Sequence, residues 1–367
     1  MDSAEIRVLL CSPMNNVGGI SRWTGHIMNY HKANKSSIEL DLFYHLKEGS
    51  YQNYSVFHRI FKGVRNYIPF LIGLNKKLTS TDYNVIHLSS SASIGLFRDL
   101  FSLQIAKRHG VRSIIHFHFG RIPDIFAKNN WEQKLFKKVA KRVDKIIVLD
   151  SQSLDFLKRE GYKSVEILPN PLAPSVIDII EKHSDIVRRD DLILFAGHLI
   201  PTKGVFELIE ACRDIDNIAL KMVGYVTEGM KSDLLAKAGD NWKEWLEITG
   251  EQTFEDTIKD MLNAGIFVLP TYSEGFPNVI LESMACASPI IASAVGAIPE
   301  MLGNLQDRQC GVCVEPKNVN QLKEAIAKMR DDREFAVNCG INAKQRVNDL
   351  YSMPTIWEKL TKIWRQN

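Results

Sequence analysis

One segment, from Leu269 to Ala285, has residue types that could bind a phosphorylated sugar. It begins as an apolar run typical of a buried strand, continues as a loop, and reaches Pro277, which suits the first turn of a helix. The first backbone N–H groups of a helix have no partner within it, and they lie at its positive end. We expect the N–H groups of Phe276, Asn278 and Val279 to favour a diphosphate here.

Two carboxylates flank this predicted anion site. Glu274 lies in the loop, and Glu282 lies about one turn beyond Asn278. A carboxylate can accept two hydrogen bonds from neighbouring hydroxyls, as on a ribose or a hexose. The pattern therefore fits a ligand with a sugar at each end and phosphate in the middle, and the alternative is a capped helix with ordinary surface acids.

The elements that must position these residues follow an alternating pattern. In the first half, the predicted strands are 6–10, 40–44, 85–88, 113–117, 145–149 and 165–168, and the predicted helices are 20–30, 94–108, 131–142 and 151–159. Such alternation is typical of a parallel sheet covered by helices on both faces.

The pattern restarts after a proline-rich segment. Three prolines between Pro169 and Pro174 disfavour regular structure and predict a hinge, and the charged stretch 181–191 follows it. The predicted strands then are 192–196, 220–223, 246–249, 266–269 and 289–293, and the predicted helices are 205–212, 231–238, 254–263, 279–285, 320–329, 333–348 and 355–364. We predict an α/β protein with two facing Rossmann-like doubly wound domains and a cleft between them.

Size and composition agree with this division. The 367 residues suit two domains of roughly 150 residues each, and 45% hydrophobic with 24% charged residues is typical of a soluble globular protein. From the polar start of the chain we expect no signal peptide, and from the lack of a long apolar run we expect no membrane span. Six scattered cysteines favour free thiols in the cytoplasm, and we interpret Cys310 and Cys313, the latter on a short strand, as packing residues instead of a zinc or redox pair.

The charge distribution points to a surface partner. Residues 57–78 contain bases and bulky apolar residues without any acid, and residues 134–145 are also basic. Basic amphipathic segments bind anionic membranes, so we expect peripheral contact with the inner face of a membrane. The alternative is a solvated helix face, and nothing in these segments resembles a nucleic-acid-binding motif.

The segment from Glu274 through Glu282 to Glu300 resembles the E-x7-E signature of glycosyltransferase family 4. Other segments resemble the same family in the same order, so that the likeness covers nearly the whole chain: 13–20 its N-terminal glycine loop, 114–120 the strand that delivers a histidine, 168–171 the segment entering the hinge, and 196–204 the phosphate-binding loop. The resemblance implies a GT-B fold and transfer with retention, without a divalent metal ion or other cofactor. It implies an N-terminal acceptor domain over 1–170, a C-terminal nucleotide-sugar domain over 171–350, and a last helix, 351–367, that packs back toward the first domain.

The resemblance also implies roles for residues of the C-terminal domain. Glu282 should hold the ribose hydroxyls, and Glu274 should lie near the donor sugar. Lys203 should neutralise the departing diphosphate, as a metal does in other transferases. The donor-contacting set that it implies is Asn170, the last residue of the predicted first domain, together with His198, Lys203, Gly275, Phe276, Pro277, Asn278, Val279 and Glu282 of the second.

In the N-terminal domain, Gly18 and Gly19 should let the backbone approach the diphosphate. His118 should point toward the reacting sugar, and we expect His116 to face the opposite side of the sheet. One departure is His198, which stands where family members commonly have arginine, so a fixed bidentate cation is replaced by a smaller group that can be neutral at pH 7.

The resulting hypothesis is a hexosyltransferase that uses a UDP- or GDP-sugar. Its acceptor would be a glycan or a lipid-linked glycan, as in cell-surface polysaccharide, lipopolysaccharide or glycolipid assembly. Two alternatives stay open: a nucleotide-sugar epimerase on the same fold, and a binding protein that holds the donor without turnover. A nicotinamide oxidoreductase is disfavoured, because neither domain has G-x-G-x-x-G after its first strand.

Overall fold

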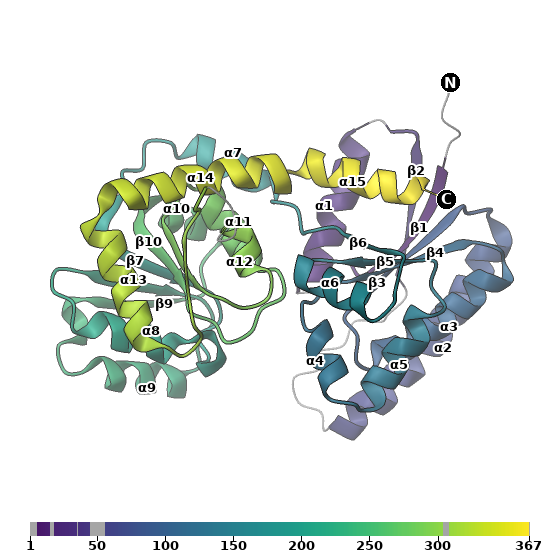
Figure 1. The fold of residues 1–367 in the computed structure, drawn as a ribbon, viewed down its shortest axis with the longest axis horizontal. Helices are drawn as coiled ribbons and strands as arrows, with labels where there is room; N and C mark the ends of the chain where they lie inside the picture. The colour runs from purple at the N-terminus through teal and green to yellow at the C-terminus, as the bar shows by residue number, and fades with distance from the viewer. Residues whose placement is uncertain (1–5, 15–17, 35, 45–55, 304–307, 367) are drawn as a thin grey trace. The chain divides into compact units, whose positions relative to one another are not determined.

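The computed structural model describes residues 6–14, 18–34, 36–44, 56–303 and 308–366, with the backbone alone for residues 56–66. The chain divides into two compact units. Unit 1 comprises Met1–Pro169 and Ile356–Asn367, and unit 2 comprises Asn170–Thr355. Each unit contains a six-stranded sheet whose neighbouring strands are all parallel (Figure 1).

The sheet of unit 1 has the strand order β2-β1-β3-β4-β5-β6. Its strands are β1 (Ile6–Cys11), β2 (Ile38–Phe43), β3 (Val85–Ser90), β4 (Arg112–Phe117), β5 (Lys145–Val148) and β6 (Val165–Ile167). The chain winds outward from β1 in one direction to β2 and in the other to β3, so the topological switch point lies between β1 and β3. Ligands of doubly wound folds bind at the carboxyl ends of the strands beside such a point.

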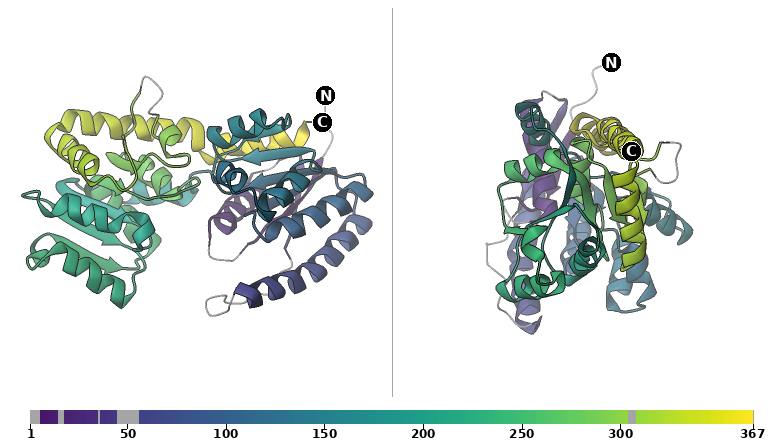
Figure 2. Two further views of the ribbon diagram at one scale, coloured as in Figure 1. Left: turned by 60° about the horizontal axis from the view of Figure 1, so that its bottom comes forward. Right: turned by 90° about the vertical axis from the view of Figure 1, so that its left-hand side faces the viewer.

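Helices cover both faces of this sheet (Figures 1 and 2). The helices of unit 1 are α1 (Gly19–Ala33), α2 (Val56–Ser80), α3 (Gly95–Arg108), α4 (Ile122–Ala127), α5 (Trp131–Ala140), α6 (Ser151–Arg159) and most of α15 (Met353–Arg365). One hydrophobic core joins Leu9, Ile86 and Ile115 of the sheet to apolar residues of α2, α3 and α5. The opposite face packs against α1 and α15, where Trp364 Nε1 donates a hydrogen bond to His87 Nδ1 over 3.0 Å.

The sheet of unit 2 has the order β12-β11-β10-β7-β8-β9. Its strands are β7 (Arg189–Ala196), β8 (Ala219–Val223), β9 (Leu246–Gly250), β10 (Ala264–Leu269), β11 (Ile290–Ser293) and β12 (Val312–Val314). The strand order reverses between β7 and β10, which pair directly, for example Phe267 with Leu194. The loops that follow these two strands therefore meet at the switch point.

The helical elements of unit 2 are α7 (Pro174–Lys182), η1 (Pro201–Lys203), α8 (Val205–Arg213), α9 (Glu228–Ala238), η2 (Trp242–Glu244), α10 (Phe254–Asn263), α11 (Asn278–Ala285), α12 (Ile298–Met301), α13 (Val319–Asp331) and α14 (Arg333–Tyr351). Within the described residues, no helix is both long and apolar enough to cross a membrane.

The predicted α/β fold class is confirmed, and every predicted strand and helix has a counterpart in the structure. The sequence patterns missed the helices α2, α4, α7 and α12, and the segment of α2 was interpreted only as a basic amphipathic stretch. The charged stretch 181–191 was predicted only as a connection, but its last three residues are the start of β7, which begins at Arg189. Cys313 lies on the predicted short strand, and all six cysteines are free thiols.

Candidate active site

Two predicted site residues meet at the switch point of unit 2. Lys203 ends the short helix η1, in the loop after β7, and Glu274 lies in the loop after β10. Their side chains form an ion pair, and each is about one quarter exposed or less, at 25% for Lys203 and 20% for Glu274. Because both side chains are already largely buried, each can contact a ligand with little further loss of hydration.

The two loops are joined by their backbones as well as by this ion pair. Tyr272 N donates to Thr202 O over 2.9 Å. Gly204 has φ +70°, and a Cβ atom there would lie 2.0 Å from Pro270 O. Only glycine allows this close approach, so the residue after Lys203 fixes the distance between the two loops.

A second glycine supports the loop that carries Glu274. Gly296 has φ +55°, and a Cβ atom there would lie 2.2 Å from Glu274 O. The next residue, Ala297, donates its backbone N–H to Gly275 O over 2.9 Å. The loop after β11 therefore packs directly against the backbone of Glu274 and Gly275, and this contact fixes the position of the loop that carries Glu274.

Helix α11 begins where the sequence predicts it, at Asn278 with Pro277 as its cap residue. Pro277 provides no side-chain cap for the first turn. Asn170 approaches this turn, because its Nδ2 atom donates to Phe276 O over 3.3 Å and to Asn278 Oδ1 over 3.1 Å. Asn278 and Val279 are partly exposed, so a ligand can reach the backbone at the start of the helix.

Glu282 lies one turn further along α11 and is buried, with 8% of its surface exposed. Carboxylates are seldom buried to this extent, so the alternative of an ordinary surface acid does not hold for Glu282.

Sequence reasoning missed one polar pair beneath the same loop. The Tyr272 hydroxyl donates to Glu207 Oε1 over 2.5 Å, and Lys317 Nζ lies 4.7 Å from the centre of the Tyr272 ring. Burial and the neighbouring Glu207 carboxylate raise the pKa of Tyr272 to about 12, so the phenol stays protonated and keeps donating. The only feature of the sequence that indicates this pair is the position of Tyr272 in the loop before α11.

In unit 1, the predicted glycines lie at the start of α1, after β1. Gly18 caps the helix with φ +142°, a value that side-chain-bearing residues rarely adopt, and Gly19 is its first residue. Both are exposed, and no described atom lies within 4 Å of a Cβ built on either. The conformation therefore requires glycine at position 18, and among the described residues none crowds position 19.

His118 follows β4 at the carboxyl edge of the same sheet, and its backbone N–H donates to Ser90 O over 3.0 Å. The prediction that His116 faces the opposite side is wrong: the two imidazole centres lie 3.8 Å apart. Side chains alternate along a strand, so residues two apart share a face. Trp23 of α1 packs against both rings, at 5.1 Å from His116 and 4.9 Å from His118.

Burial keeps the imidazoles of this cluster neutral. Removal from water lowers the pKa of His87 and that of His118 to about 3 each, and it lowers the pKa of His116 well below its usual value. A neutral imidazole can donate one hydrogen bond and accept another, but it cannot neutralise a diphosphate. His118 is therefore suited to orienting a sugar hydroxyl, and the cation of the candidate site is Lys203.

His198 lies in the loop after β7 and is exposed. Its nearest aromatic neighbour is Tyr225, with ring centres 6.0 Å apart.

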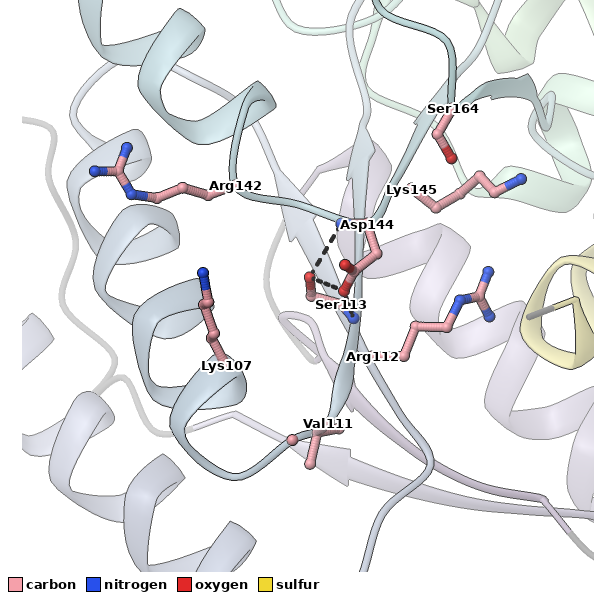
Figure 3. Close-up of a pocket in the computed structure, with 9 residues that line it drawn as sticks. Lys107, Val111, Arg112, Ser113, Arg142, Asp144, Lys145 and Ser164 are labelled. Atoms are coloured by element: carbon pink, nitrogen blue, oxygen red, sulfur yellow. Dashed lines mark hydrogen bonds between the residues drawn. The ribbon is translucent and has the colours of Figure 1, made fainter.

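A hollow of about 480 Å³ in unit 1 lies apart from all these residues (Figure 3). It is lined by Arg112 and Lys145, which begin β4 and β5, so it lies at the amino ends of the strands, whereas His118 follows a carboxyl end. Figure 3 shows Lys107 and Arg142 on one side of Asp144, with Arg112 and Lys145 on the other. The latter two are already engaged, Arg112 by the carbonyl oxygens of 363 and 364, and Lys145 by Glu166 at 2.5 Å. We do not assign this hollow to the active site.

Comparison with known proteins agrees with the geometry. The family model described as glycosyltransferase family 4 matches residues 17–176, and the model described as glycosyl transferases group 1 matches residues 176–346. The chain belongs to glycosyltransferase family 4.

Proteins with similar sequences include an uncharacterised glycosyltransferase of Methanocaldococcus jannaschii, which is 33% identical over 45% of this chain and 44% of its own length. A UDP-Gal:alpha-D-GlcNAc-diphosphoundecaprenol alpha-1,3-galactosyltransferase of Escherichia coli is 26% identical over 77% of this chain and 78% of its own. The chain spans about half the length of the first curated relatives that it matches.

Solved structures of two other proteins share the fold of this family 4 chain. The sucrose-phosphate synthase of Thermosynechococcus elongatus superimposes with a TM-score of 0.76 at 18% identity, over 98% of each chain. The Anabaena protein HepE in complex with UDP gives a TM-score of 0.71 at 14% identity, over 97% of this chain and 98% of that one. These likenesses show the GT-B fold.

Proposed function

We propose that this protein transfers a hexose-type sugar from a UDP- or GDP-sugar to a hydroxyl group of a glycan or lipid-linked acceptor, with retention at the anomeric carbon and without a metal ion. The observation that carries the proposal is the Lys203–Glu274 ion pair. It joins the loop after β7 to the loop after β10, and the latter loop leads into α11. A cation, an acid and a helix start at a switch point suit a nucleoside diphosphate with a sugar attached.

In the proposed reaction, the acceptor oxygen bonds to the anomeric carbon while the bond from that carbon to the diphosphate oxygen breaks. The acceptor proton passes to a diphosphate oxygen on the same face, and Lys203 stabilises the negative charge that develops there. Glu282 binds the ribose hydroxyls, Glu274 and the backbone of 275–278 bind the donor sugar, and neutral His118 orients it. Because Lys203 supplies the positive charge, we expect chelation of divalent ions to leave the rate unchanged.

The nature of the acceptor is inferred from the relatives and from charge. The E. coli relative is named for a diphosphoundecaprenol-linked acceptor, and residues 134–145 form a basic segment in unit 1. The side chains of 57–66, in the other basic segment, lie outside the described residues. We propose peripheral attachment to the inner face of a membrane, in polysaccharide or glycolipid assembly.

The first test is a panel of UDP- and GDP-sugars measured by thermal stabilisation, because a ligand that binds only the folded state raises its unfolding midpoint. The stabilising donor is then incubated with lipid-linked and water-soluble glycan acceptors, and nucleotide release and anomeric configuration are measured. We expect acceptor-dependent release with an unchanged anomeric configuration. If no UDP- or GDP-sugar stabilises the protein, the proposal is wrong.

A binding protein without turnover is the second candidate, and His198 is the observation that favours it. An exposed imidazole replaces the arginine that the family pattern has at this position. Such a protein would be stabilised by a donor but would release no nucleotide with any acceptor. An epimerase would convert the donor without an acceptor, so the same panel separates all three functions.

A further inference from the structure

The exposed apolar side chains of unit 1 gather on three neighbouring helices. Among its described residues, five large apolar side chains are exposed: Ile68 (58%), Ile72 (65%), Phe97 (42%), Phe101 (54%) and Trp131 (50%). They belong to α2, α3 and α5, which lie side by side on one face of the sheet (Figures 1 and 2). Large apolar side chains that cluster on a surface, instead of being scattered, indicate an interaction site.

Contacts between these helices show that the exposed residues lie on neighbouring elements. The rings of Phe97 and Trp131 are stacked at 6.3 Å with an interplanar angle of 14°, which links α3 to α5. Helix α2 packs against α3 in the interior, where the Arg98 guanidinium lies 5.5 Å from the centre of the buried Phe70 ring, so Ile68 and Ile72 lie on the helix next to these rings. We call the solvent-facing side of α2, α3 and α5 the three-helix face.

The charges on this face all have one sign. Exposed bases follow the apolar residues along each helix: Lys76 on α2, Lys107 and Arg108 on α3, and Lys134 and Lys138 on α5. The three helices contain only two acids, Asp99 and Glu132. Both are buried, and both are paired, Asp99 with Arg98 at 2.6 Å and Glu132 with Arg121 at 3.0 Å.

We propose that the three-helix face docks on an anionic lipid bilayer. Its aromatic residues would enter the interfacial region, where amphipathic rings are favoured, and its lysines would lie at the level of the lipid phosphates. Each base near a negatively charged leaflet adds to the electrostatic attraction, and the absence of exposed acids on these three helices leaves that attraction unopposed. An acidic protein would match the bases but has no comparable need for five exposed apolar side chains.

The orientation of the helices adds a reason for this arrangement. In a parallel α/β sheet the helices run opposite to the strands, so α3 and α5 begin at the carboxyl edge of the sheet. Phe97 and Trp131 lie near the beginnings of these helices, at the same edge as His118. This part of the inference rests on the proposed function: a docked face would bring the acceptor-binding edge of unit 1 to the bilayer surface.

The test is sedimentation of the full chain with vesicles of phosphatidylglycerol and phosphatidylcholine, and with phosphatidylcholine alone. We expect binding to the anionic vesicles only, and we expect it to fall as salt rises. The variants Phe97→Ser/Phe101→Ser and Lys134→Glu/Lys138→Glu should each lower the partition coefficient about tenfold or more.

Matched controls exist in unit 2. Val337 and Ile341 are exposed at the same spacing on α14, and Lys328 and Lys344 are exposed lysines. The variants Val337→Ser/Ile341→Ser and Lys328→Glu/Lys344→Glu should bind vesicles as the unaltered protein does. Equal losses in both sets would overturn the proposal, as would a lack of vesicle binding by the unaltered protein.

Donor stabilisation of the same variants separates this inference from the proposed function. Variants that lose vesicle binding should still be stabilised by the nucleotide sugar, since the face contains no donor residue. Light scattering tests whether a second copy covers the face: a dimer that Phe97→Ser/Phe101→Ser converts to a monomer, without any vesicle binding, would overturn membrane docking. If no nucleotide sugar stabilised the unaltered protein, that result would contradict the proposed function alone.

Discussion

At the scale of single residues, the ion pair between Lys203 and Glu274 joins two loops that are 71 positions apart in the chain. Sequence motifs gave each residue a separate role, but no pattern in the sequence indicated that they contact each other. The contact places the only charge that we assign to the leaving diphosphate next to the acid that we assign to the donor sugar. The proposed roles of both residues can therefore be tested together.

Lys203→Ala should lower the rate of nucleotide release about 100-fold, because it removes the charge that stabilises the departing diphosphate. Lys203→Arg should retain more of the rate. The measurement is acceptor-dependent nucleotide release at saturating donor.

Lys221→Ala is the matched control for this prediction. Lys221 is also a partly buried lysine of unit 2, and its Nζ pairs with Asp260 Oδ1 at 2.7 Å. This variant should lose a comparable amount of stability while the rate is kept. Equal rate losses in the two variants would mean that Lys203 acts only through folding.

The histidine cluster predicts how stability depends on pH. The pKa of His87 is about 3 in the folded protein, below the value of about 6.5 in an unfolded chain, so the unfolded state binds more protons between these values. Stability therefore falls as pH falls below about 6.5, and His87 alone should cost about 2 kcal/mol between pH 7 and pH 5. Urea unfolding followed by tryptophan fluorescence measures this, since Trp23 and Trp364 both contact the cluster.

His87→Gln tests the assignment, because glutamine offers Trp364 an acceptor but takes up no proton in this range. Its loss of stability between pH 7 and pH 5 should be about 2 kcal/mol smaller than that of the unaltered protein. The same pH dependence in both proteins would show that another group is responsible.

The error over His116 also belongs to this scale. The sequence places His116 and His118 at i and i+2 of one strand, and strand geometry alone puts them on one face. By contrast, the packing of Trp23 on both rings could not be predicted, because it depends on how α1 crosses the sheet. The roles of the site residues toward a ligand stay predictions.

At the scale of elements, glycines set the distances between the site loops. Gly204→Ala and Gly296→Ala should each lower the free energy of unfolding by about 2 kcal/mol or more, since each adds a Cβ next to a backbone oxygen in a left-handed conformation. Both should also weaken donor binding, because Pro270 and Glu274 must move. Thermal unfolding with and without the donor measures both effects.

Gly229→Ala is the control, because Gly229 lies in helix α9 and no described atom is within 4 Å of an added Cβ. Its stability should be unchanged or slightly raised, as alanine favours helices. If Gly204→Ala and Gly296→Ala were as stable as Gly229→Ala, the loops would not be held as described.

Elements with strong patterns were predicted well, and those at prolines were not. The strand and helix around Leu269 and Asn278 begin and end within a few residues of the prediction, because their apolar runs and the intervening Pro277 are unambiguous. Helix α7 was missed because Pro174 was interpreted as the end of a hinge, whereas proline at the first position of a helix is favourable. Helices α4 and α12 are six and four residues long, too short for a helical period to appear.

At the scale of the whole molecule, the two units have sheets of the same doubly wound type but different kinds of candidate site residues. Unit 2 contains the cation, the acids and the helix start, whereas unit 1 contains the exposed Gly18 and Gly19, the neutral imidazoles and the three-helix face. The alternating pattern was enough to predict the fold class. The predicted cleft between the two domains stays a prediction, because the sequence pattern defines each sheet but not what lies between them.

The central claim is that the switch point of unit 2 binds the donor, and titration calorimetry with UDP and GDP tests it most directly. We expect one of the two nucleotides to bind, Glu282→Gln and Glu282→Ala to weaken it at least about tenfold through lost ribose hydrogen bonds, and Glu324→Ala, at an exposed acid of the same unit, to leave it unchanged. Binding that is equally strong in folded Glu282→Ala and in the unaltered protein would contradict the account.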